Sequence, residues 1–110
     1  MSPIEMDELI HAPTRLKIMS ALVELGENSE ITFSRLQNLL EMTPGNMSAH
    51  IKRLERAGYL ATTKTFTRRG VAQTRIRVTS RGVTAFEDYV RQLQTLIRTP
   101  LNAHTHAEQR

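Results

Sequence analysis

The sequence predicts a small, mainly α-helical domain that carries one β-hairpin, and two patterns indicate this fold class. Apolar residues recur every three or four positions through most of the chain, which is typical of amphipathic helices. Over residues 60–78 the pattern changes to an alternation rich in β-branched residues, interrupted by the turn-like sequence TRRG. The chain has 110 residues, 39% of them hydrophobic, which suits one domain with a modest core.

Four helices are predicted before the hairpin, over residues 3–10, 13–25, 33–40 and 44–57. The third and fourth have a suitable capping threonine, because the hydroxyl of Thr32 or Thr43 would accept a hydrogen bond from a free backbone N–H. Prolines whose missing N–H costs nothing at an early helical position are Pro3, Pro13 and Pro44. We expect a short extended piece around Ile31, and helix ends at Gly26 and Gly58.

The predicted hairpin pairs residues 60–66 with residues 71–78 across a tip at residues 67–70. A long final helix follows, which we expect to end at Pro100 because an interior proline removes a backbone hydrogen bond. Residues 1–99 then form one domain, and residues 100–110 form a flexible polar tail. The order of four helices, a hairpin and a long helix favours the winged helix-turn-helix architecture, in which the hairpin is the wing.

The net charge of +4 conceals an uneven distribution of charged residues. Residues 1–30 carry a balance of −4, residues 31–82 a balance of +8, and residues 83–110 a balance of zero. Positive charge confined to one segment is the electrostatic pattern expected of a surface that binds a polyanion. A solvated basic face that only maintains solubility is the alternative, and charge alone does not separate the two.

The helix over residues 44–57 has two unlike faces. Met47, Ile51 and Leu54 fall on one narrow stripe that suits a core, while small residues and cations share the opposite face. Lys52 and Arg56 are like charges four positions apart, which destabilises an isolated helix by about 0.2–0.5 kcal/mol. DNA phosphates would turn this repulsion into attraction, and small residues beside donors suit entry into a major groove. An ordinary solvated helix face is the alternative.

Arg68 and Arg69 at the hairpin tip extend the same positive segment, and such arginines suit phosphates or an adjacent minor groove. Charged residues that only protect a strand edge are the alternative. For His50, beside the buried stripe, a hydrogen bond to the backbone is favoured over a phosphate contact and a metal ligand is not expected. The predicted DNA-binding residues are Ser34, Arg35, Thr43, Gly45, Asn46, Ser48, Ala49, Lys52, Arg53, Arg56, Lys64, Arg68, Arg69 and Arg75.

A family resemblance covers residues 9–97 and is carried by three segments, LIHAPTRLKIMSAL, GNMSAHIKRLERAGYL and VTSRGVTAFEDYV. They resemble winged-helix transcriptional regulators related to the MarR and ArsR groups, and in particular the small winged helix DNA-binding domain family. The resemblance implies a homodimer, a role in transcription regulation, and DNA-facing positions for Asn46, Ser48, Ala49, Lys52 and Arg53. Family members commonly carry a proline after the basic wing residues, where this chain has Gly70 and Val71.

The long final helix has more apolar surface than its own core needs, and its spacing suits helix–helix pairing. We expect the N- and C-terminal helices to form a dimer interface from Ile4, Met6, Ile10, Tyr89, Val90, Leu93, Leu96 and Ile97. Two-fold pairing would place the two recognition helices about 34–36 Å apart, which implies a pseudo-palindromic binding site.

These patterns predict a homodimeric, sequence-specific regulator that binds double-stranded DNA, with repression favoured over activation and no cofactor. The helix over residues 44–57 would lie in the major groove, and the wing, residues 61–78, on the backbone or in the minor groove. The alternative is a winged-helix protein-interaction module whose first and last helices dock another protein. A small-molecule effector stays open, although no polar cluster marks a pocket for it. The sequence has no motif typical of an enzyme, so we do not expect enzymatic activity.

Other classes of site have little support in the sequence. The chain has no cysteine, which excludes disulfides and thiolate metal ligands. His104 and His106, joined by His11, Glu87 or Asp88, leave a metal-responsive repressor as a less favoured alternative, because zinc normally takes four ligands with fixed support. No apolar run approaches the roughly 18 residues of a membrane span, and the N-terminal residues are acidic, unlike a signal peptide. We therefore expect a cytoplasmic protein without membrane contact.

Overall fold

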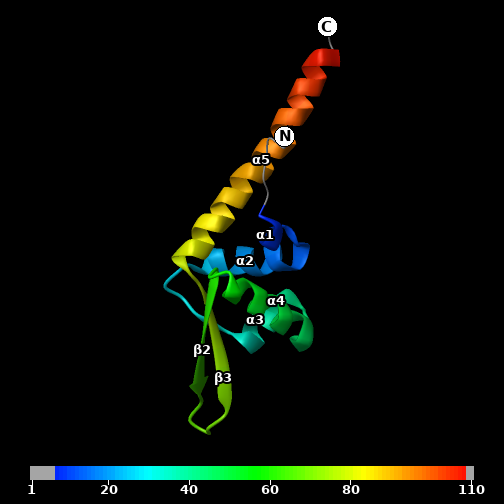
Figure 1. The fold of residues 1–110 in the computed structure, drawn as a ribbon. Helices are drawn as coiled ribbons and strands as arrows, with labels where there is room; N and C mark the ends of the chain where they lie inside the picture. Colours follow the sequence, from blue (N-terminus) through cyan, green and yellow to red (C-terminus); the bar gives the residue numbers. More distant parts are fainter. Residues whose placement is uncertain (1–6, 109–110) are drawn as a thin grey trace.

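The computed structural model describes the backbone of residues 7–108 and the side-chain surroundings of residues 7–98. Within them the elements follow one another as α1 (Glu8–His11), α2 (Pro13–Leu25), β1 (Ile31–Thr32), α3 (Phe33–Leu40), α4 (Pro44–Arg56), β2 (Leu60–Phe66), β3 (Ala72–Val78) and α5 (Ser80–Glu108) (Figure 1). This order confirms the predicted winged helix-turn-helix architecture: α2, α3 and α4 precede a wing formed by β2 and β3.

A threonine caps the N-terminus of each of the last two helices of the helix-turn-helix unit, α3 and α4. The Thr32 hydroxyl accepts a hydrogen bond from the backbone N–H of Arg35 at 3.2 Å, and the Thr43 hydroxyl accepts one from Asn46 at 3.3 Å. Between the helices, Glu41 adopts a left-handed conformation with φ of 54°, which turns the chain out of α3. Both predicted caps are confirmed, and they fix where α4 starts.

The sheet has three antiparallel strands in the order β1–β3–β2. Ile31 of β1 pairs with Ile76 of β3, so the short extended piece predicted around Ile31 is a third strand beside the hairpin. Leu60, Ile76 and Val78 are buried on the face that packs against the helices. Arg77, on the opposite face, is exposed, which is the alternation expected of a sheet with one covered face.

The core lies between the helices and that covered face. Met47, Ile51 and Leu54 are buried, which confirms the narrow apolar stripe predicted for α4. Leu25 and Leu39 are 42% and 64% exposed, whereas Leu40 at the end of α3 packs against the core. The buried residues of the core are Ile10, Ile18, Met19, Leu22, Leu36, Met47, Ile51, Leu54, Leu60, Ile76, Val78 and Tyr89.

The wing and α5 meet at a tight junction. The Thr79 hydroxyl donates to the carbonyl oxygen of Gly58 at 2.5 Å and accepts from the N–H of Gly82 at 3.0 Å. The Thr79 N–H donates to the carbonyl oxygen of Tyr59 at 3.0 Å. A Cβ atom at position 82 would lie 2.2 Å from that same carbonyl oxygen, so only glycine fits there. This contact fixes the point at which α5 leaves the sheet.

The first helix is tied to the same junction. The Asp7 carboxylate caps α1 by accepting from the N–H groups of Leu9 and Ile10 at 2.9 and 3.2 Å, and the Tyr59 hydroxyl donates to it at 2.5 Å. Burial, followed by this hydrogen bond and the Asp7 charge, raises the pKa of Tyr59 to about 12. The helix predicted over residues 3–10 begins at Glu8 in the described part, and residues 3–6 lie outside it. We refer to Asp7, Gly58, Tyr59, Thr79 and Gly82 as the Thr79 junction.

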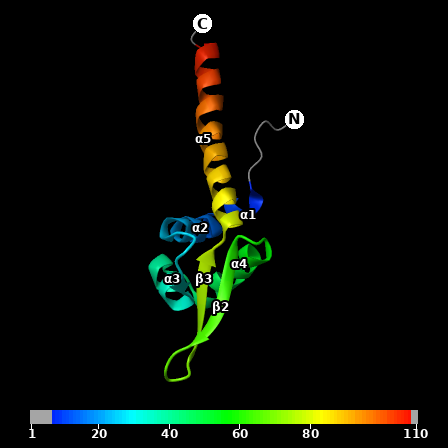
Figure 2. The same ribbon diagram turned by 90° about the vertical axis from the view of Figure 1, so that its left-hand side faces the viewer.

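The last helix continues past the proline that was expected to end it. α5 runs over Ser80–Glu108, so the prediction that this helix ends at Pro100 was wrong. The flexibility of residues 100–110 stays a prediction. A proline within a helix removes one backbone hydrogen bond, and the bonds on either side are independent of it. α5 leaves the body on the side opposite to the hairpin tip, as both views show (Figure 1, Figure 2). None of the helices in the described residues is both long and apolar enough to cross a membrane.

Candidate nucleic-acid interface

The outer face of α4 is the best-defined candidate surface. Because Met47, Ile51 and Leu54 are buried on one side, the helix turns its small and cationic residues outward. Gly45, Asn46, Ala49, Lys52, Arg53 and Arg56 are all exposed, and Ser48 is half-buried. A Cβ atom at position 45 would meet nothing within 4 Å, so the start of α4 is open to a partner.

Within residues 7–98, the cations of α4 have no acidic partner. Glu55, the acidic residue of this helix, accepts a hydrogen bond from the Thr62 hydroxyl of β2 at 2.6 Å instead. Among the side chains of residues 7–98, the ion pair that forms joins Arg91 and Asp88 on α5. The carboxylate of Glu55 therefore anchors α4 to the wing and leaves the charge of the outer face unneutralised.

His50 connects the side of α4 to α2. Its Nδ1 atom lies 3.2 Å from a guanidinium nitrogen of Arg15, and Arg15 also donates to the carbonyl oxygen of Leu9 at 2.6 Å. Because arginine can only donate, His50 accepts at Nδ1 and carries its proton at Nε2. Burial, and then the charges of Arg15 and Arg53, lower the pKa of His50 and favour this neutral form. The partner is a side chain and not the backbone that was expected.

The wing extends the positive surface beyond α4. Lys64, Arg68 and Arg69 are exposed, and none of the residues 56–86 is acidic. The tip is closed by a hydrogen bond of 2.9 Å from the N–H of Gly70 to the carbonyl oxygen of Thr67. We refer to the outer face of α4 together with Lys64, Arg68 and Arg69 as the cationic surface.

The predicted residues outside this surface divide into two groups. Ser34 and Arg35 are exposed in the first turn of α3, beside the capping residue Thr32. Arg75 was expected to join the DNA-binding set, but it is half-buried on β3, one position from the buried Ile76, and so lies on the sheet face turned away from the helices. The structure does not bring Arg75 together with α4.

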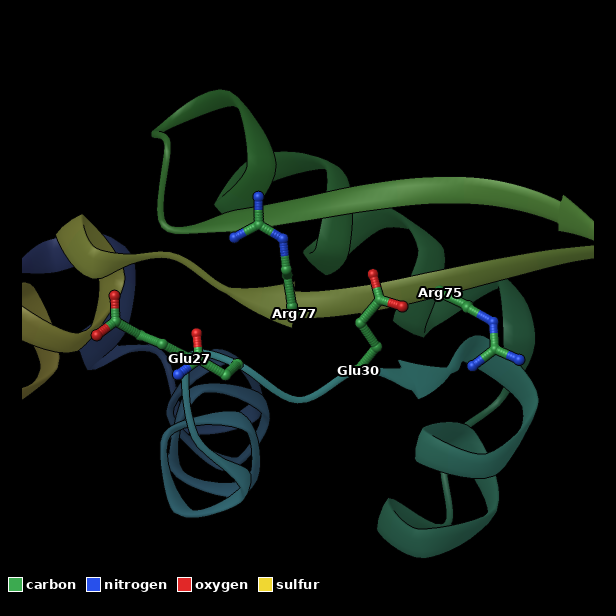
Figure 3. Close-up of a pocket in the computed structure, with 5 residues that line it drawn as sticks. Glu27, Glu30, Arg75 and Arg77 are labelled. Carbon is green, nitrogen blue, oxygen red and sulfur yellow. The ribbon is translucent and has the colours of Figure 1, made fainter.

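Arg75 instead lines an open hollow of about 440 Å³ with Glu27, Asn28, Glu30 and Arg77. Glu27 and Arg75 lie at opposite ends of this hollow and point away from each other, with Arg77 and Glu30 between them (Figure 3). Two carboxylates and two guanidinium groups balance in charge, and they do not converge on one point. The hollow therefore has neither the net charge nor the geometry of an anion site.

The residues expected at a dimer interface also divide. Ile10 and Tyr89 are 0% and 2% exposed within the single chain, and the Tyr89 hydroxyl lies 3.1 Å from Nδ1 of His11. Both therefore belong to the protomer's own core, and their assignment to an interface was wrong for that reason. Val90 and Leu93 are half-buried and pack against the core, whereas Leu96 and Ile97 are 41% and 53% exposed. Ile4 and Met6 lie outside the described residues.

Two residues of interest carried no signal in the sequence. Arg15 joins α1, α2 and α4 through its two hydrogen bonds, a role that depends on contacts between distant segments. Phe66 ends β2 and is 70% exposed, whereas alternation alone places it on the covered face of the sheet. Within the part of the chain that the structure describes, no group of three or more histidine, aspartate or glutamate residues could hold a metal ion.

The fold and this surface define the class: a winged helix-turn-helix whose exposed lysines and arginines on α4 and the wing have no acidic partner within residues 7–98. The chain belongs to the winged helix DNA-binding domain family, whose sequence model matches residues 14–97. It is 33% identical to an uncharacterized protein of Methanocaldococcus jannaschii over 89 residues, which cover 81% of this chain and 92% of that one.

Solved structures agree with this assignment. The transcriptional regulator homologue of Pyrococcus horikoshii is 31% identical, with a TM-score of 0.74 over 83% of this chain and 86% of its own. FabT of Streptococcus pneumoniae, solved in complex with DNA, shares the fold at 19% identity, with a TM-score of 0.53 over 86% of this chain and 66% of FabT. The family and the Pyrococcus relative confirm the predicted class, a DNA-binding transcriptional regulator and not an enzyme.

Proposed function

We propose that this chain is a homodimeric repressor that binds a pseudo-palindromic operator in double-stranded DNA. α4 of each protomer would lie in a major groove, and the wing would contact adjacent phosphates or the minor groove. The observation that carries this proposal is the cationic surface, where exposed lysines and arginines of α4 and the wing have no acidic partner within the described residues. The fold shared with FabT, which is solved in complex with DNA, supports the same mode of use.

The residues of the cationic surface suit different parts of a duplex. Gly45 and Ala49 leave room for close approach, so that Asn46 and Arg53 reach base edges as hydrogen-bond donors. Phosphates attract cations and accept hydrogen bonds from hydroxyl groups, and the residues placed for them are Ser34, Arg35, Thr43, Ser48, Lys52, Arg56, Lys64, Arg68 and Arg69. Phosphate contacts would set affinity for every sequence, and base contacts would set preference among sequences.

Dimerisation is proposed from the part of α5 that leaves the body. Leu96 and Ile97 are exposed there, next to the half-buried Val90 and Leu93, at the spacing of one helix face. A matching strip on a second copy would bury these side chains across a two-fold axis. The two α4 helices would then lie about one turn of DNA apart, about 34–36 Å.

Repression needs only that a bound dimer cover the duplex, whereas activation needs a further contact with the transcription machinery. Repression is therefore the simpler proposal. It is tested by transcription in vitro from a promoter that contains the selected site, where added protein is expected to lower transcript yield. An increase in yield would replace repression by activation without affecting the DNA-binding proposal.

DNA binding is tested by fluorescence anisotropy with a random duplex and with a duplex selected by the protein from a random pool, each at several salt concentrations. We expect affinity to fall steeply with salt for both duplexes, because phosphate contacts release counterions. We also expect the selected duplex to bind at least about a thousandfold more tightly at physiological salt. A protein-interaction module, the alternative class, would bind neither duplex at any salt concentration.

The dimer is tested by sedimentation of the wild-type protein and of a variant with Leu96→Glu and Ile97→Glu. We expect the wild type to be a dimer and the variant a monomer, because like charges would be buried across the axis. Thr95→Glu is the control, since Thr95 is exposed on the opposite side of the same helix turn and its substitution adds one negative charge where the double variant adds two. A wild-type monomer that binds the selected duplex with full affinity would contradict the dimer.

A further inference from the structure

One face of the wing carries a graded row of side chains that ends in an exposed aromatic ring. Leu60, Thr62, Lys64 and Phe66 lie on the same face of β2, opposite Val78, Ile76, Thr74 and Ala72 of β3. Along this row the environment changes from buried at Leu60, which is 2% exposed, to open at Phe66, which is 70% exposed. Phe66 therefore projects from the face that packs on the helices, but beyond the point where they cover it.

The tip next to Phe66 is held by its own hydrogen bonds. The N–H of Thr67 donates to the carbonyl oxygen of Val71 at 2.9 Å, and the N–H of Val71 donates to the Thr67 hydroxyl at 3.1 Å. Gly70 closes the turn with φ of 80°, a conformation that favours glycine. These bonds fix the tip, so the direction of Phe66 is set by the register of the strands.

The surroundings of Phe66 indicate what it contacts. Lys64 lies two residues before it on the same face, and Arg68 and Arg69 follow at the tip, while residues 56–86 contain no acidic side chain. Ala72, its partner across the ladder, lines a shallow hollow with Phe33 and Ser34 at the start of α3, on the helix side of the wing. An apolar ring surrounded by cations is complementary to a partner whose surface is polyanionic and which has an apolar recess that can hold the ring. A DNA minor groove, with its phosphates and its sugar and base edges, has this chemistry.

We propose that Phe66 is an apolar wedge that enters the minor groove of the bound duplex beside the recognition helix. Arg68 and Arg69 hold the phosphates at the groove's edges, and the ring partly unstacks one base step. Pyrimidine–purine steps unstack most easily, so the wedge adds sequence preference at a step that no hydrogen bond reads. This inference rests on the proposed function, because it requires the wing and α4 to bind one duplex.

The test uses the full-length protein and its selected duplex, with 2-aminopurine placed in turn at the steps on either side of the α4 contact. Wild-type protein is expected to raise the fluorescence at one step, because 2-aminopurine brightens when it unstacks. Phe66→Ala is expected to abolish this rise and to weaken binding about tenfold, in the range of one lost aromatic–base contact. Phe66→Leu, which keeps an apolar wedge, is expected to retain part of both effects.

Val71→Ala is the matched control. Val71 is 60% exposed at the same tip but lies on the opposite face of the ribbon, since Thr67, its partner, alternates with Phe66. We expect its removal to change affinity less than twofold and to leave the fluorescence rise intact. Equal effects of Phe66→Ala and Val71→Ala, or no fluorescence rise with the wild type, would overturn the proposed wedge. If the wild type still binds the duplex in a salt-dependent way, the proposed function is upheld. A wild type that binds no duplex would overturn both, and a change in sedimentation from Phe66→Ala alone would assign the ring to a protein contact.

Discussion

The Thr79 junction and the cationic surface use their polar groups in opposite ways. At the junction each polar group has a partner within the chain: Thr79 bonds Gly58, Tyr59 and Gly82, and Tyr59 bonds Asp7. On the cationic surface, lysines and arginines stand exposed and unpaired within the described residues. Beside the cationic surface, Glu55 accepts a hydrogen bond from Thr62, which ties α4 to the wing without neutralising the outer face of α4.

This difference separates residues that hold the fold from residues available to a ligand. Polar groups with internal partners cost stability when they are removed, because a buried donor or acceptor is left without a bond. Exposed, unpaired cations contribute little to stability and stay free to bind phosphate. Substitutions at the junction are therefore expected to change unfolding, and substitutions on the cationic surface to change DNA affinity, each with little effect on the other.

Gly82→Ala is expected to have the largest effect. The added methyl group would overlap the Tyr59 carbonyl oxygen at 2.2 Å and a methyl carbon of Val78 at 2.9 Å, and the backbone on both sides is fixed by hydrogen bonds. Overpacking against backbone of this kind is expected to lower the free energy of unfolding by about 3 kcal/mol or more, measured by chemical denaturation.

Gly45→Ala is the matched control for that substitution. A Cβ atom at Gly45 would meet nothing within 4 Å, and alanine is the better helix former, so the free energy of unfolding is expected to rise by up to about 1 kcal/mol. Its DNA affinity is nevertheless expected to fall, since the methyl group would occupy the closest approach of α4 to the groove. Similar losses of stability from both substitutions would remove the distinction between the two regions.

Arg53→Ala is expected to change sequence preference on the cationic surface. Loss of a bidentate contact to a base should reduce discrimination by about 1–3 kcal/mol at one base pair, measured by competition among single-site variants of the selected duplex. Arg77→Ala removes another exposed cation, on the sheet face turned away from α4, and we expect it to leave discrimination unchanged. Equal losses on every duplex for Arg53→Ala would move Arg53 to the phosphate-binding group.

Arg69→Ala is expected to act through charge alone. Affinity should weaken by a similar factor for all sequences, and the slope of log affinity against log salt concentration should become shallower by about one. Anisotropy titrations at several salt concentrations measure both quantities. An unchanged slope would mean that Arg69 contacts no phosphate in the complex.

Local signals in the sequence predicted most of the fold. The caps at Thr32 and Thr43, the start at Pro44 and the alternation in the wing each depend on residues close in the chain, and the structure confirms them. The apolar stripe of α4 was predicted for the same reason, and its buried position is what turns the candidate DNA-binding residues outward. Pro100 misled because one lost hydrogen bond does not end a helix that continues on both sides.

The surroundings of two predicted site residues depend on contacts that spacing does not contain. Tyr89 lies on an amphipathic face that suits either a partner or the protomer's own core, and only its approach to His11 of α1 decides between them. Arg75 alternates with the buried Ile76, which puts it on the sheet face turned away from the helices, but only the fold brings Glu27 and Glu30 to the hollow that it lines. Arg15 and Phe66 were missed because their surroundings are set by the distances between elements.

The smallest expected effect is a pH dependence of stability at the Thr79 junction, which begins only near pH 10. The pKa of Tyr59 is raised from 10.0 to about 12, so the unfolded chain loses this proton before the folded one does. The stabilisation is therefore complete below pH 10 and is lost as the pH rises from 10 through 12. In Tyr89→Phe, where Tyr59 is the remaining tyrosine, an absorbance titration should have its midpoint at about 12 in the folded protein and near 10.0 in denaturant. Adding Asp7→Asn should lower the folded midpoint only partway, because burial is the larger cause of the raised pKa and stays in place. A folded midpoint near 10.0 in Tyr89→Phe itself would mean that the Tyr59 hydroxyl is solvated and the junction open.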